Sequence, residues 1–343
     1  MRVFIYEETC ATPRLGSSLA KSLQSEGWAM LSAALEDFAR LPGLETLSLL
    51  SDHPPSRGAS LPFLRSTTAP IHPQEFQAAF RDLASNADGT LVIAPEFDDL
   101  LYERCRWVEK AGGRLLGPSS EAVRVAGDKL ETARRLQAAS VPTPPCVRIG
   151  EHYDLGWPAV LKPRHGAGSQ ATFLVRDRGA LADTKTQAEA AGVFGDFLLQ
   201  PFVPGLACSV AFLLGPAGNL PLVPCRQDLS DDGRFHYLGG ALPLPRLLSE
   251  RAVRFGRRAV DAVPGLRGFV GVDLVLGEKD DGSEDWVIEI NPRLTTSYIG
   301  LRALCQDNLA SAMLAALQGG PLPRLKWQPG TIRFTAGGCE RET

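Results

Sequence analysis

The sequence predicts an α/β protein composed of two or three units. Its 343 residues are too many for one hydrophobic core and suit units of about 100 to 150 residues each. Residues 1–117 alternate short apolar runs with amphipathic stretches, which is the pattern of a doubly wound α/β unit. Segments further along the chain are richer in strand signals, so an α+β arrangement is expected there.

The first unit is expected to cover residues 1–117. The predicted elements are strands at 3–6, 47–50 and 91–93, helices at 17–39, 73–83 and 98–110, and a closing strand at 115–116. In the long first helix, Leu23, Met30 and Phe38 belong to an apolar set that recurs at helical spacing. Gly112 and Gly113 end the last helix.

Two further units are expected, over residues 118–200 and 201–343. Prolines at 142, 144 and 145 predict a linker, because proline cannot continue the helix expected over 129–138. The other predicted elements are strands at 159–161, 172–175, 197–199, 209–214, 220–225, 268–276 and 285–290, and helices at 181–190 and 297–318. The last few residues are assigned no fixed structure.

Composition and charge exclude several classes of protein. Hydrophobic residues make up 44% of the chain, and 36 basic against 39 acidic side chains give a net charge of −3. This ordinary globular composition disfavours a polyanion-binding surface, so no nucleic-acid partner is expected. No stretch holds the roughly 18 apolar residues of a membrane span, and Glu7 and Glu8 stand where a signal peptide needs an apolar core. We therefore expect a cytoplasmic protein without a membrane partner.

The cysteines and histidines are expected to bind no metal. The seven cysteines include no C-x-x-C pair, and the five histidines lack ligand spacing. Reduced thiols in a reducing compartment are the expected state of the cysteines.

A glycine-rich loop follows the predicted strand 159–161. Gly166, Gly168 and Ala171 match the dinucleotide pattern G-x-G-x-x-G/A, but that pattern requires a helix next, and a strand is expected from Thr172. The loop is therefore interpreted as a flap whose backbone N–H groups can close over phosphates, with a plain hairpin turn as the alternative. Lys162 at the end of the strand would be balanced by a phosphate, or would simply reach solvent. The chain contains no P-loop.

Polar residues alternate with apolar ones along the predicted strand 285–290. Glu289 and Asn291 share one face, while Ile288 and Ile290 are expected to point into the core. Together with Asp273 on a strand that could be the neighbour, they form an all-oxygen set of the kind that holds magnesium beside phosphates. Arg293 would add a planar cation. The alternative is an edge strand with a solvated polar face.

The order of these parts resembles the ATP-grasp superfamily over essentially the whole chain. The matching segments are Asp128-Lys129, Lys162 with its flap, Gln200-Pro201-Phe202-Val203, Asp273, and Glu289-Ile290-Asn291-Pro292-Arg293. Within the superfamily the chain is similar to the carboxylate-amine ligases. Ala94-Pro95-Glu96, Asp128-Lys129 and the run from Asn291 to Tyr298 look most like the tyramine-glutamate ligase group of methanofuran biosynthesis and its bacterial relatives. The implied fold is an N-terminal Rossmann-like pre-ATP-grasp domain followed by a two-subdomain ATP-grasp fold.

The resemblance also implies roles for individual residues. Adenine would sit at the hinge formed by Gln200, Pro201, Phe202 and Val203, with the carbonyl of Pro201 and the N–H of Val203 at its edge. Lys129 and Lys162 would hold phosphates of ATP, and Gly166, Gly168 and Ser169 would cover them. Asp273, Glu289 and Asn291 would bind Mg2+, or Mn2+ in its place. Arg293, Lys162 and Asn291 would be the catalytic residues.

One position departs from the family pattern. These ligases often carry a carboxylate for ribose seven residues after the first hinge position, and here that position is Ala207. The ribose would then be bound by another group, or nucleotide affinity would be lower.

The substrates are expected to lie against the first unit and the start of the last helix. Thr295, Thr296 and Ser297 precede that helix, whose N-terminus offers N–H groups to an anion, although helix capping is an equally good explanation. Glu8 and Glu96 follow strands at the carboxyl edge of the first sheet, where ligands of open sheets gather. Glu8 could meet an ammonium group, or could be an ordinary loop residue.

The function implied by the resemblance is amide formation from a carboxylic acid and an amine, driven by ATP through an acyl phosphate. Glutamate or a similar amino acid is a candidate substrate. Three alternatives stay open: an ATP-binding sensor or scaffold, an ATP-grasp enzyme that phosphorylates or carboxylates a small molecule, and, on the glycine pattern alone, a nicotinamide oxidoreductase. A homodimer is compatible with this size.

Overall fold

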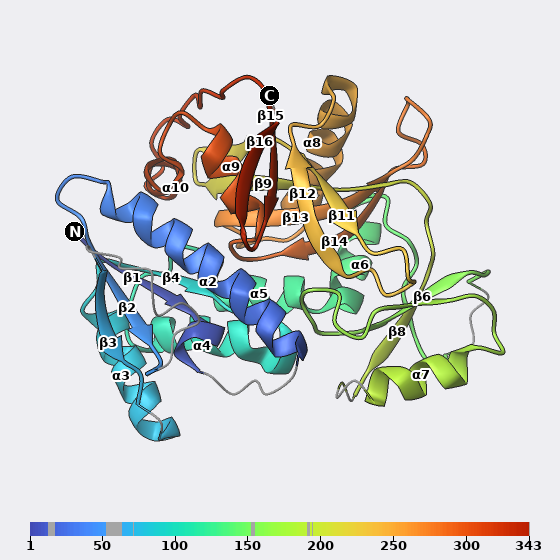
Figure 1. Cartoon of the computed structure of the whole chain (residues 1–343), viewed down its shortest axis with the longest axis horizontal. Helices are drawn as coiled ribbons and strands as arrows, with labels where there is room; N and C mark the ends of the chain where they lie inside the picture. Colours follow the sequence, from blue (N-terminus) through green and yellow to red (C-terminus); the bar gives the residue numbers. More distant parts are fainter. Residues whose placement is uncertain are drawn as a thin grey trace.

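The computed structural model describes residues 1–12, 18–52, 64–70, 72–151, 155–190, 193 and 195–342. Within them the strands form three sheets, which Figure 1 shows as a parallel sheet at the left, a large sheet at the top and a small sheet at the right. The α/β class predicted from the sequence is confirmed. So is the order of a parallel sheet first and antiparallel sheets after it.

The N-terminal sheet is parallel and has the strand order β3-β2-β1-β4. Its strands are β1 (Arg2–Glu7), β2 (Glu45–Leu50), β3 (Leu64–Thr68) and β4 (Gly89–Ile93), and its helices are α1 (Glu8–Ala11), α2 (Ser18–Ala39), α3 (Pro73–Ser85) and α4 (Leu100–Lys110), with the 3-10 turn η1 (Phe97–Asp99) before α4. The strand predicted at 115–116 is present only as a single parallel bridge between Leu115 and Thr90. The sequence patterns did not predict β3. The first residue expected in the helix that corresponds to α2, residue 17, lies outside the described residues.

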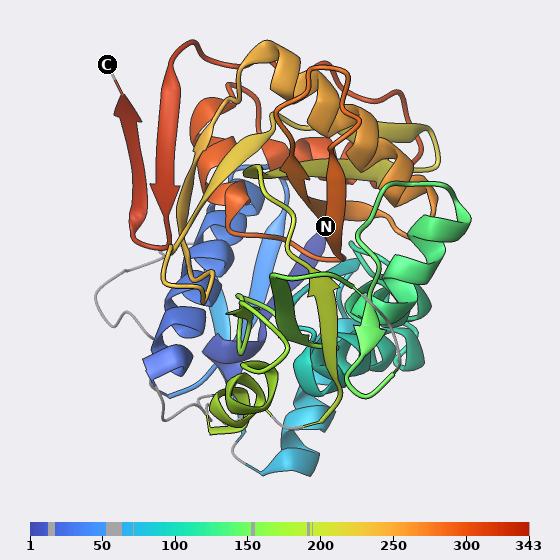
Figure 2. The same cartoon turned by 90° about the vertical axis from the view of Figure 1, so that its right-hand side faces the viewer.

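The small sheet has the order β5-β8-β6-β7 and is antiparallel. Its elements are β5 (Val147–Arg148), β6 (Ala159–Pro163), β7 (Phe173–Val175), α7 (Leu181–Ala190) and β8 (Phe197–Pro201). It has an apolar core of its own, in which Leu161, Phe173 and Phe197 are buried together. Figure 2 shows this sheet facing the viewer below the large sheet.

The large sheet runs in the order β14-β13-β9-β11-β12-β15-β16, with β10 paired to β9. Its strands are β9 (Leu206–Gly215), β10 (Gly218–Pro221), β11 (Cys225–Leu229), β12 (Tyr237–Leu242), β13 (Gly268–Leu276), β14 (Trp286–Asn291), β15 (Thr331–Thr335) and β16 (Gly338–Glu342), and its helices are α8 (Arg246–Asp261), α9 (Ser297–Leu304) and α10 (Leu309–Leu317). Strands β9 and β13 pair over nine residues at its centre.

Two short helices connect the N-terminal sheet to the rest of the chain. α5 (Ser120–Gly127) is capped by Ser119, and α6 (Lys129–Ala138) by Asp128, whose carboxylate accepts from the N–H groups of Leu130 and Glu131. Both helices pack against β14 of the large sheet, and α5 also contacts α4. The boundaries at residues 117 and 200 stay a proposal. α6 packs on β14, whereas α5 contacts both α4 of the N-terminal unit and β14 of the large sheet.

Several predicted elements need correction. The helix expected over 297–318 is two helices, because the chain leaves helical geometry after Leu304 and the side chain of Asn308 caps a new start at α10. The strand expected over 220–225 ends at Pro221 and resumes as β11, since Pro224 has no N–H for a ladder. The tail is not irregular, because β15 and β16 form an antiparallel hairpin.

The N-terminal sheet and the large sheet share one apolar core. Met30, Leu31 and Phe38 of α2 are buried in the same cluster as Leu301 of α9 and Met313 of α10. Figure 1 shows α2 between the parallel sheet and these two helices. Polar contacts reinforce the core, because Asp37 of α2 accepts hydrogen bonds from the hydroxyl of Tyr298 at 2.8 Å and from the guanidinium of Arg302 at 2.7 Å.

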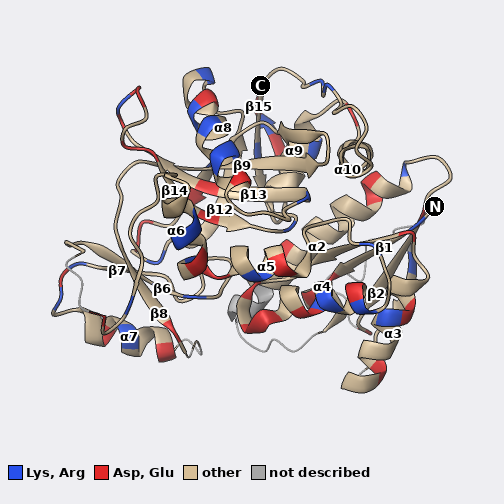
Figure 3. Cartoon of the chain, turned by 180° about the vertical axis from the view of Figure 1, so that it is seen from behind, with Lys and Arg blue, Asp and Glu red and all other residues tan. Residues whose placement is uncertain are grey.

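Charged residues of both signs are mixed along the elements in the view from behind in Figure 3, in keeping with the net charge of −3. In the part of the chain that is described, no helix is long and apolar enough to cross a bilayer.

Candidate active site

A cavity of about 550 Å³ lies between the small sheet, the large sheet and α2. Its walls include the predicted catalytic residue Arg293 and every residue predicted to bind nucleotide or metal: Lys129, Lys162, Gly166, Gly168, Ser169, Gln200, Pro201, Phe202, Val203, Asp273, Glu289 and Asn291. These residues come from segments more than 160 positions apart, so the fold brings together what the sequence keeps separate. Ala207 also lines the cavity and carries no polar group there.

Lys162 is buried at the end of β6, with a relative exposure of 5%. Its ammonium donates a hydrogen bond of 2.8 Å to the side-chain oxygen of Gln200, which lies on the paired strand β8. Among the described residues no carboxylate forms an ion pair with Lys162. Burial therefore lowers the pKa of Lys162.

The flap after β6 is a strand-to-strand connection, since β6 and β7 pair antiparallel. This geometry confirms that the glycine pattern is not a Rossmann turn. Gly168 has φ of 64°, in the left-handed region that glycine adopts without strain, and Ser169 follows at 56°. Lys129 holds the flap, because its ammonium donates to the carbonyl of Gly166 at 2.9 Å.

Lys129 also pairs with Glu289 of β14 at 3.0 Å. Burial alone would lower the pKa of Lys129, but the carboxylates of Glu289 and Glu96 outweigh it, and the pKa is raised. Lys129 therefore stays charged and joins the flap to the large sheet.

The register of β13 and β14 places Asp273 directly opposite Glu289, and Gly271 opposite Asn291. Asp273 accepts hydrogen bonds from the side-chain amides of Asn291 at 2.9 Å and Gln227 at 3.0 Å. Burial and the nearby charge of Glu289 raise the pKa of Asp273 to about 7. The carboxylates of Asp273 and Glu289 thus face each other, and the amide of Asn291 is bonded to Asp273. The positive charge nearby is too small to balance both carboxylates. No group of three His, Cys, Asp or Glu residues within the described ranges could hold a metal by itself.

The expected position of Ile288 needs correction. The ladder between β13 and β14 shifts register between Asp273 and Leu274, where a β-bulge leaves Ile288 without a partner. Ile288 consequently lines the cavity instead of the core, whereas Ile290 is buried as expected.

Arg293 is anchored by the N-terminal unit. Its guanidinium donates two hydrogen bonds to the carboxylate of Glu96, at 2.8 and 3.1 Å, and the two side chains are 11% and 6% exposed. Burial alone would lower the pKa of Arg293, but the carboxylates of Glu96, Glu289 and Glu26 together outweigh it, and the pKa is raised. Glu96 itself does not line the cavity, so its contact with the site runs through Arg293.

Glu8 lies away from the cavity, contrary to the expectation that it could meet an ammonium group. Its carboxylate forms a buried pair with Arg104, at 2.8 and 2.9 Å, and accepts from the hydroxyl of Tyr6 at 2.7 Å. With Arg104, Tyr6 and Thr12 all bonded to it, this carboxylate is engaged within the N-terminal unit.

Thr295, Thr296 and Ser297 line the cavity at the start of α9. Thr296 occupies the N-cap position but makes no side-chain cap hydrogen bond. Its hydroxyl instead donates to the carboxylate of Glu26 at 3.3 Å, and Thr295 and Ser297 share a hydrogen bond of 2.8 Å.

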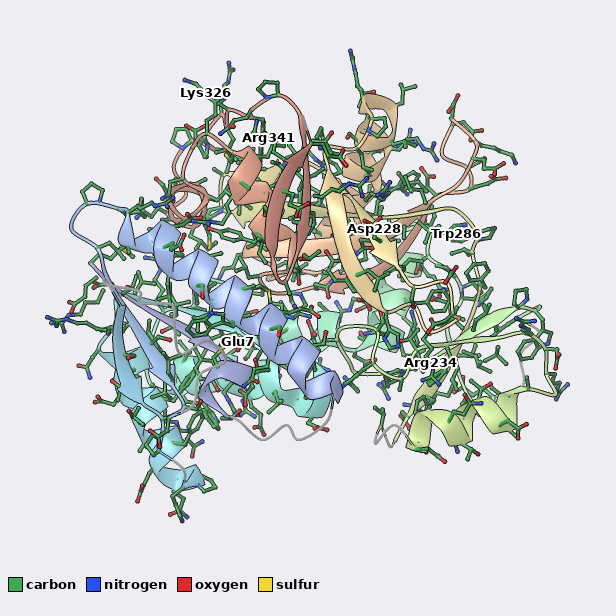
Figure 4. The ribbon with its side chains drawn as sticks, viewed as in Figure 1. Glu7, Asp228, Arg234, Trp286, Lys326 and Arg341 are labelled. Atoms are coloured by element: carbon green, nitrogen blue, oxygen red, sulfur yellow. The ribbon has the colours of Figure 1, made fainter. Side chains whose placement is uncertain are left out.

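Sequence reasoning missed four residues of this site: Glu26, Gln227, Phe235 and Tyr237. Glu26 could have been found, because it falls between Leu23 and Met30 on the apolar stripe of α2, where a charge is unexpected. Phe235 could not, since its ring stacks on Phe202 at 6.1 Å only after the β11–β12 loop folds back over the small sheet. Arg234 of that loop lies over the ring of Phe173, beside the small sheet in Figure 4.

Comparison with known proteins supports the resemblance to the ATP-grasp superfamily that the sequence motifs indicated. The ATP-grasp domain family matches residues 126–297, half of the chain, and the pre ATP-grasp 3 domain family matches residues 46–123. The chain is 30% identical over 243 residues to a tyramine–L-glutamate ligase of Methanocaldococcus fervens, covering 70% of each protein. It is 31% identical over 219 residues to that of Methanocaldococcus jannaschii, covering 64% of this chain and 60% of the relative.

Solved structures show the same fold. An ATP-grasp superfamily protein from Archaeoglobus fulgidus superposes with a TM-score of 0.70 at 24% identity, covering 97% of this chain and 91% of the other. The L-amino acid ligase from Bacillus licheniformis gives 0.70 at 18% identity, covering 97% of this chain and 78% of the other. From the cavity, the two matched domain families and these relatives together, the chain belongs to the ATP-grasp family.

Proposed function

We propose that this protein is an ATP- and Mg2+-dependent carboxylate-amine ligase, which forms an amide through an acyl phosphate and releases ADP and phosphate. The observation that carries the proposal is the charge arrangement in the cavity. Lys162 is buried without a carboxylate partner in the described part of the chain, while Asp273 and Glu289 face each other across β13 and β14. A phosphate chain with a divalent cation supplies the charge that each side lacks.

The nucleotide would lie between the two antiparallel sheets. Adenine would meet the hinge residues Gln200 to Val203, where the carbonyl of Pro201 accepts and the N–H of Val203 donates. Pro201 is compatible with this role because only its carbonyl is used. The ring of Phe202, already stacked on Phe235, supplies an apolar wall for the base. Ala207 offers no group for ribose, which is consistent with the departure noted in the sequence.

The phosphates would lie between the flap and the two lysines. Lys162 and Lys129 are cations that line the cavity, Lys162 with 5% relative exposure and Lys129 with 12% of its side chain exposed, and the flap carries Gly166, Gly168 and Ser169 along the wall. Lys129 already bonds to the flap, so its ammonium is positioned where the flap would close over phosphate oxygens.

Asp273, Glu289 and Asn291 fit a divalent cation. Their side chains offer oxygen ligands on one face of adjacent strands. Burial and, after it, the charge of Glu289 raise the pKa of Asp273, and a bound cation would offset both effects. Bound Mg2+, or Mn2+, would neutralise the charge of the phosphate chain.

The remaining side chains suit acyl transfer. A carboxylate is a poor acyl donor, and phosphorylation turns one of its oxygens into a leaving group. Lys162 and Arg293 are placed to stabilise negative charge on the transferred phosphoryl group and on the tetrahedral oxyanion that follows. Asn291 holds Asp273 in place through its amide.

The substrate assignment rests on the relatives. Two proteins about 30% identical to this chain are named for tyramine and L-glutamate, so glutamate or a similar amino acid is the proposed acid and a primary amine the proposed nucleophile. Both partners are small molecules. A cytoplasmic location and a homodimer stay predictions from the sequence.

The test is Mg2+-dependent release of ADP from ATP across a matrix of acids and amines that includes glutamate and tyramine. The double variant Glu289→Ala, Asn291→Ala should lose release. A matched control, Glu284→Ala with Asn219→Ala, removes the same two side-chain types from the surface of the same unit and should keep it.

Each rival function predicts a different result. Release that needs one acid and one amine supports the ligase. Release with a single co-substrate supports an enzyme that phosphorylates or carboxylates a small molecule. ATP binding without release under any pair supports a sensor or scaffold, and absence of ATP binding refutes the proposal.

A further inference from the structure

Glu26 of α2 is a carboxylate that faces the cavity from the N-terminal unit. Its two oxygens accept hydrogen bonds of 3.3 Å from the hydroxyls of Ser22 and Thr296. Within the described residues it has no ion-pair partner, whereas Glu289 pairs with Lys129 and Glu96 with Arg293. Glu26 therefore presents to the cavity a carboxylate that has no ion-pair partner among the described residues.

The surroundings of Glu26 select the kind of ligand that would bind it. Burial raises the pKa of Glu26, and a cation brought next to it would lower that pKa again. A metal ion is a poor candidate, because the other groups bonded to Glu26 are hydroxyls and no second carboxylate of the described chain joins it. A carboxylate substrate would be repelled. An organic ammonium group fits, since it donates hydrogen bonds and tolerates one carboxylate.

The position of Glu26 relative to Arg293 fits an amine that attacks an acyl group. The positive charge of Arg293 acts on Glu26, and both side chains line the same end of the cavity with Thr296. Arg293 suits the activated acid, so an amine held by Glu26 would stand beside its target. Tyr237, whose ring also lines this end, adds a wall for an apolar amine.

On the basis of the proposed function, we infer that Glu26 binds the ammonium group of the amine substrate and accepts the proton that frees its lone pair. The ammonium gives one proton to Glu26 and becomes a neutral amine. Its lone pair forms the C–N bond as the C–O bond to phosphate breaks, and phosphate leaves with that electron pair. The second proton lost by nitrogen ends on the phosphate, so charge and atoms balance. The sequence anticipated such a carboxylate, but at Glu8.

The test compares a charged probe with a neutral one of the same shape. Tyramine and its alcohol analogue, in which a hydroxyl replaces the ammonium, are titrated by calorimetry into wild type and Glu26→Gln with ADP and Mg2+ present. Wild type should prefer tyramine, and Glu26→Gln should lose about 10- to 100-fold in tyramine affinity while alcohol affinity is unchanged. Unchanged alcohol binding shows that the variant site is folded. The control Glu45→Gln removes a surface carboxylate of the same unit, which pairs with Arg2 and Arg65, and should behave as wild type.

Kinetics then separates this inference from the proposed function. If an acid and amine pair releases ADP, Glu26→Gln should raise KM for the amine and leave KM for ATP and for the acid within about twofold. A rise in KM for the acid instead overturns the inference. If no pair releases ADP, the proposed function fails, and the titrations still decide the amine site. A wild type that binds neither probe, or binds both equally, refutes that site.

Discussion

The pair between Glu96 and Arg293 should be the most sensitive link between the N-terminal unit and the cavity. Glu96→Gln keeps the volume of the side chain but removes its charge and one of two acceptor oxygens at 2.8 and 3.1 Å. Arg293 then stays buried, at 11% exposure, without its ion-pair partner. Leaving one partner of a buried pair costs about 3 kcal/mol in free energy of unfolding.

The matched control is Glu121→Gln. Glu121 binds Arg124 with the same two-bond geometry, at 3.0 and 2.6 Å, but their side chains are 68% and 47% exposed. An exposed pair contributes about 0 to 1 kcal/mol, so Glu121→Gln shows what the same substitution costs in a pair that is exposed and lies within one helix. Equilibrium urea unfolding followed by tryptophan fluorescence measures both losses.

The rate of ADP release is the second measurement on the Glu96→Gln variant. Because Glu96 orients Arg293, ADP release should fall at least about tenfold, and up to the 100- to 1,000-fold typical of losing one preorganised donor. ATP affinity should stay within about twofold, since the hinge does not involve this pair. The reasoning is refuted if both variants lose the same stability, or if Glu96→Gln keeps wild-type release.

Three further predictions concern burial and close contact. Burial raises the pKa of Glu7 from 4.5 to about 7, so the folded protein keeps a proton that the unfolded chain releases, and stability falls as pH rises through that window. Glu7→Gln should flatten this dependence, gaining relative to wild type in thermal unfolding between pH 5 and pH 8; an unchanged difference contradicts it. Gly27→Ala places a methyl group 2.5 Å from the carboxylate of Glu7, which lies behind α2 in Figure 4, and should cost about 1 to 3 kcal/mol in urea unfolding despite the better helix propensity of alanine. Lys162→Gln should weaken ATP binding in calorimetry about 10- to 100-fold, whereas Lys185→Gln on the exposed face of α7 should not, and equal affinities would count against the phosphate role.

Local patterns accounted for most of the N-terminal unit. The apolar runs of β1 and β4 are buried throughout, apart from Arg2, so their signal was strong. The strand β12 escaped prediction because Gly239 and Gly240 weaken a strand signal. They are required there by close packing, as a Cβ at Gly240 would lie 2.5 Å from the carbonyl of Arg226.

Two other elements, α8 and the β15–β16 hairpin, were not predicted although the sequence contains a pattern for each. α8 buries Ala252, Phe255 and Ala259 at helical spacing, and the terminal hairpin turns at Ala336 and Gly337, so both patterns were present in the sequence. The break between α9 and α10 depends on Asn308, whose amide also donates to the carbonyl of Asp37 at 2.7 Å. That partner lies in α2, and a single-sequence pattern cannot reveal it.

In the candidate site, too, local patterns predicted some residues and could not predict long-range contacts. Residues on one strand, such as Glu289 and Asn291, could be assigned to one face by alternation alone. The contact between Glu96 and Arg293 spans 197 positions, and the one between Glu26 and Thr296 spans 270. Such contacts depend on how the N-terminal unit docks, which no local pattern encodes.

The core shared by α2, α9 and α10 has a consequence for synthesis on the ribosome. Asp37 leaves the ribosome 261 residues before its partner Tyr298. At about 5 to 20 residues per second, the apolar face of α2 waits roughly 10 to 50 seconds for the helices that cover it. The parallel sheet can form during that time, but one side of α2 stays exposed. The nascent chain should therefore depend on chaperones most strongly after the first unit has emerged and before α9 and α10 arrive.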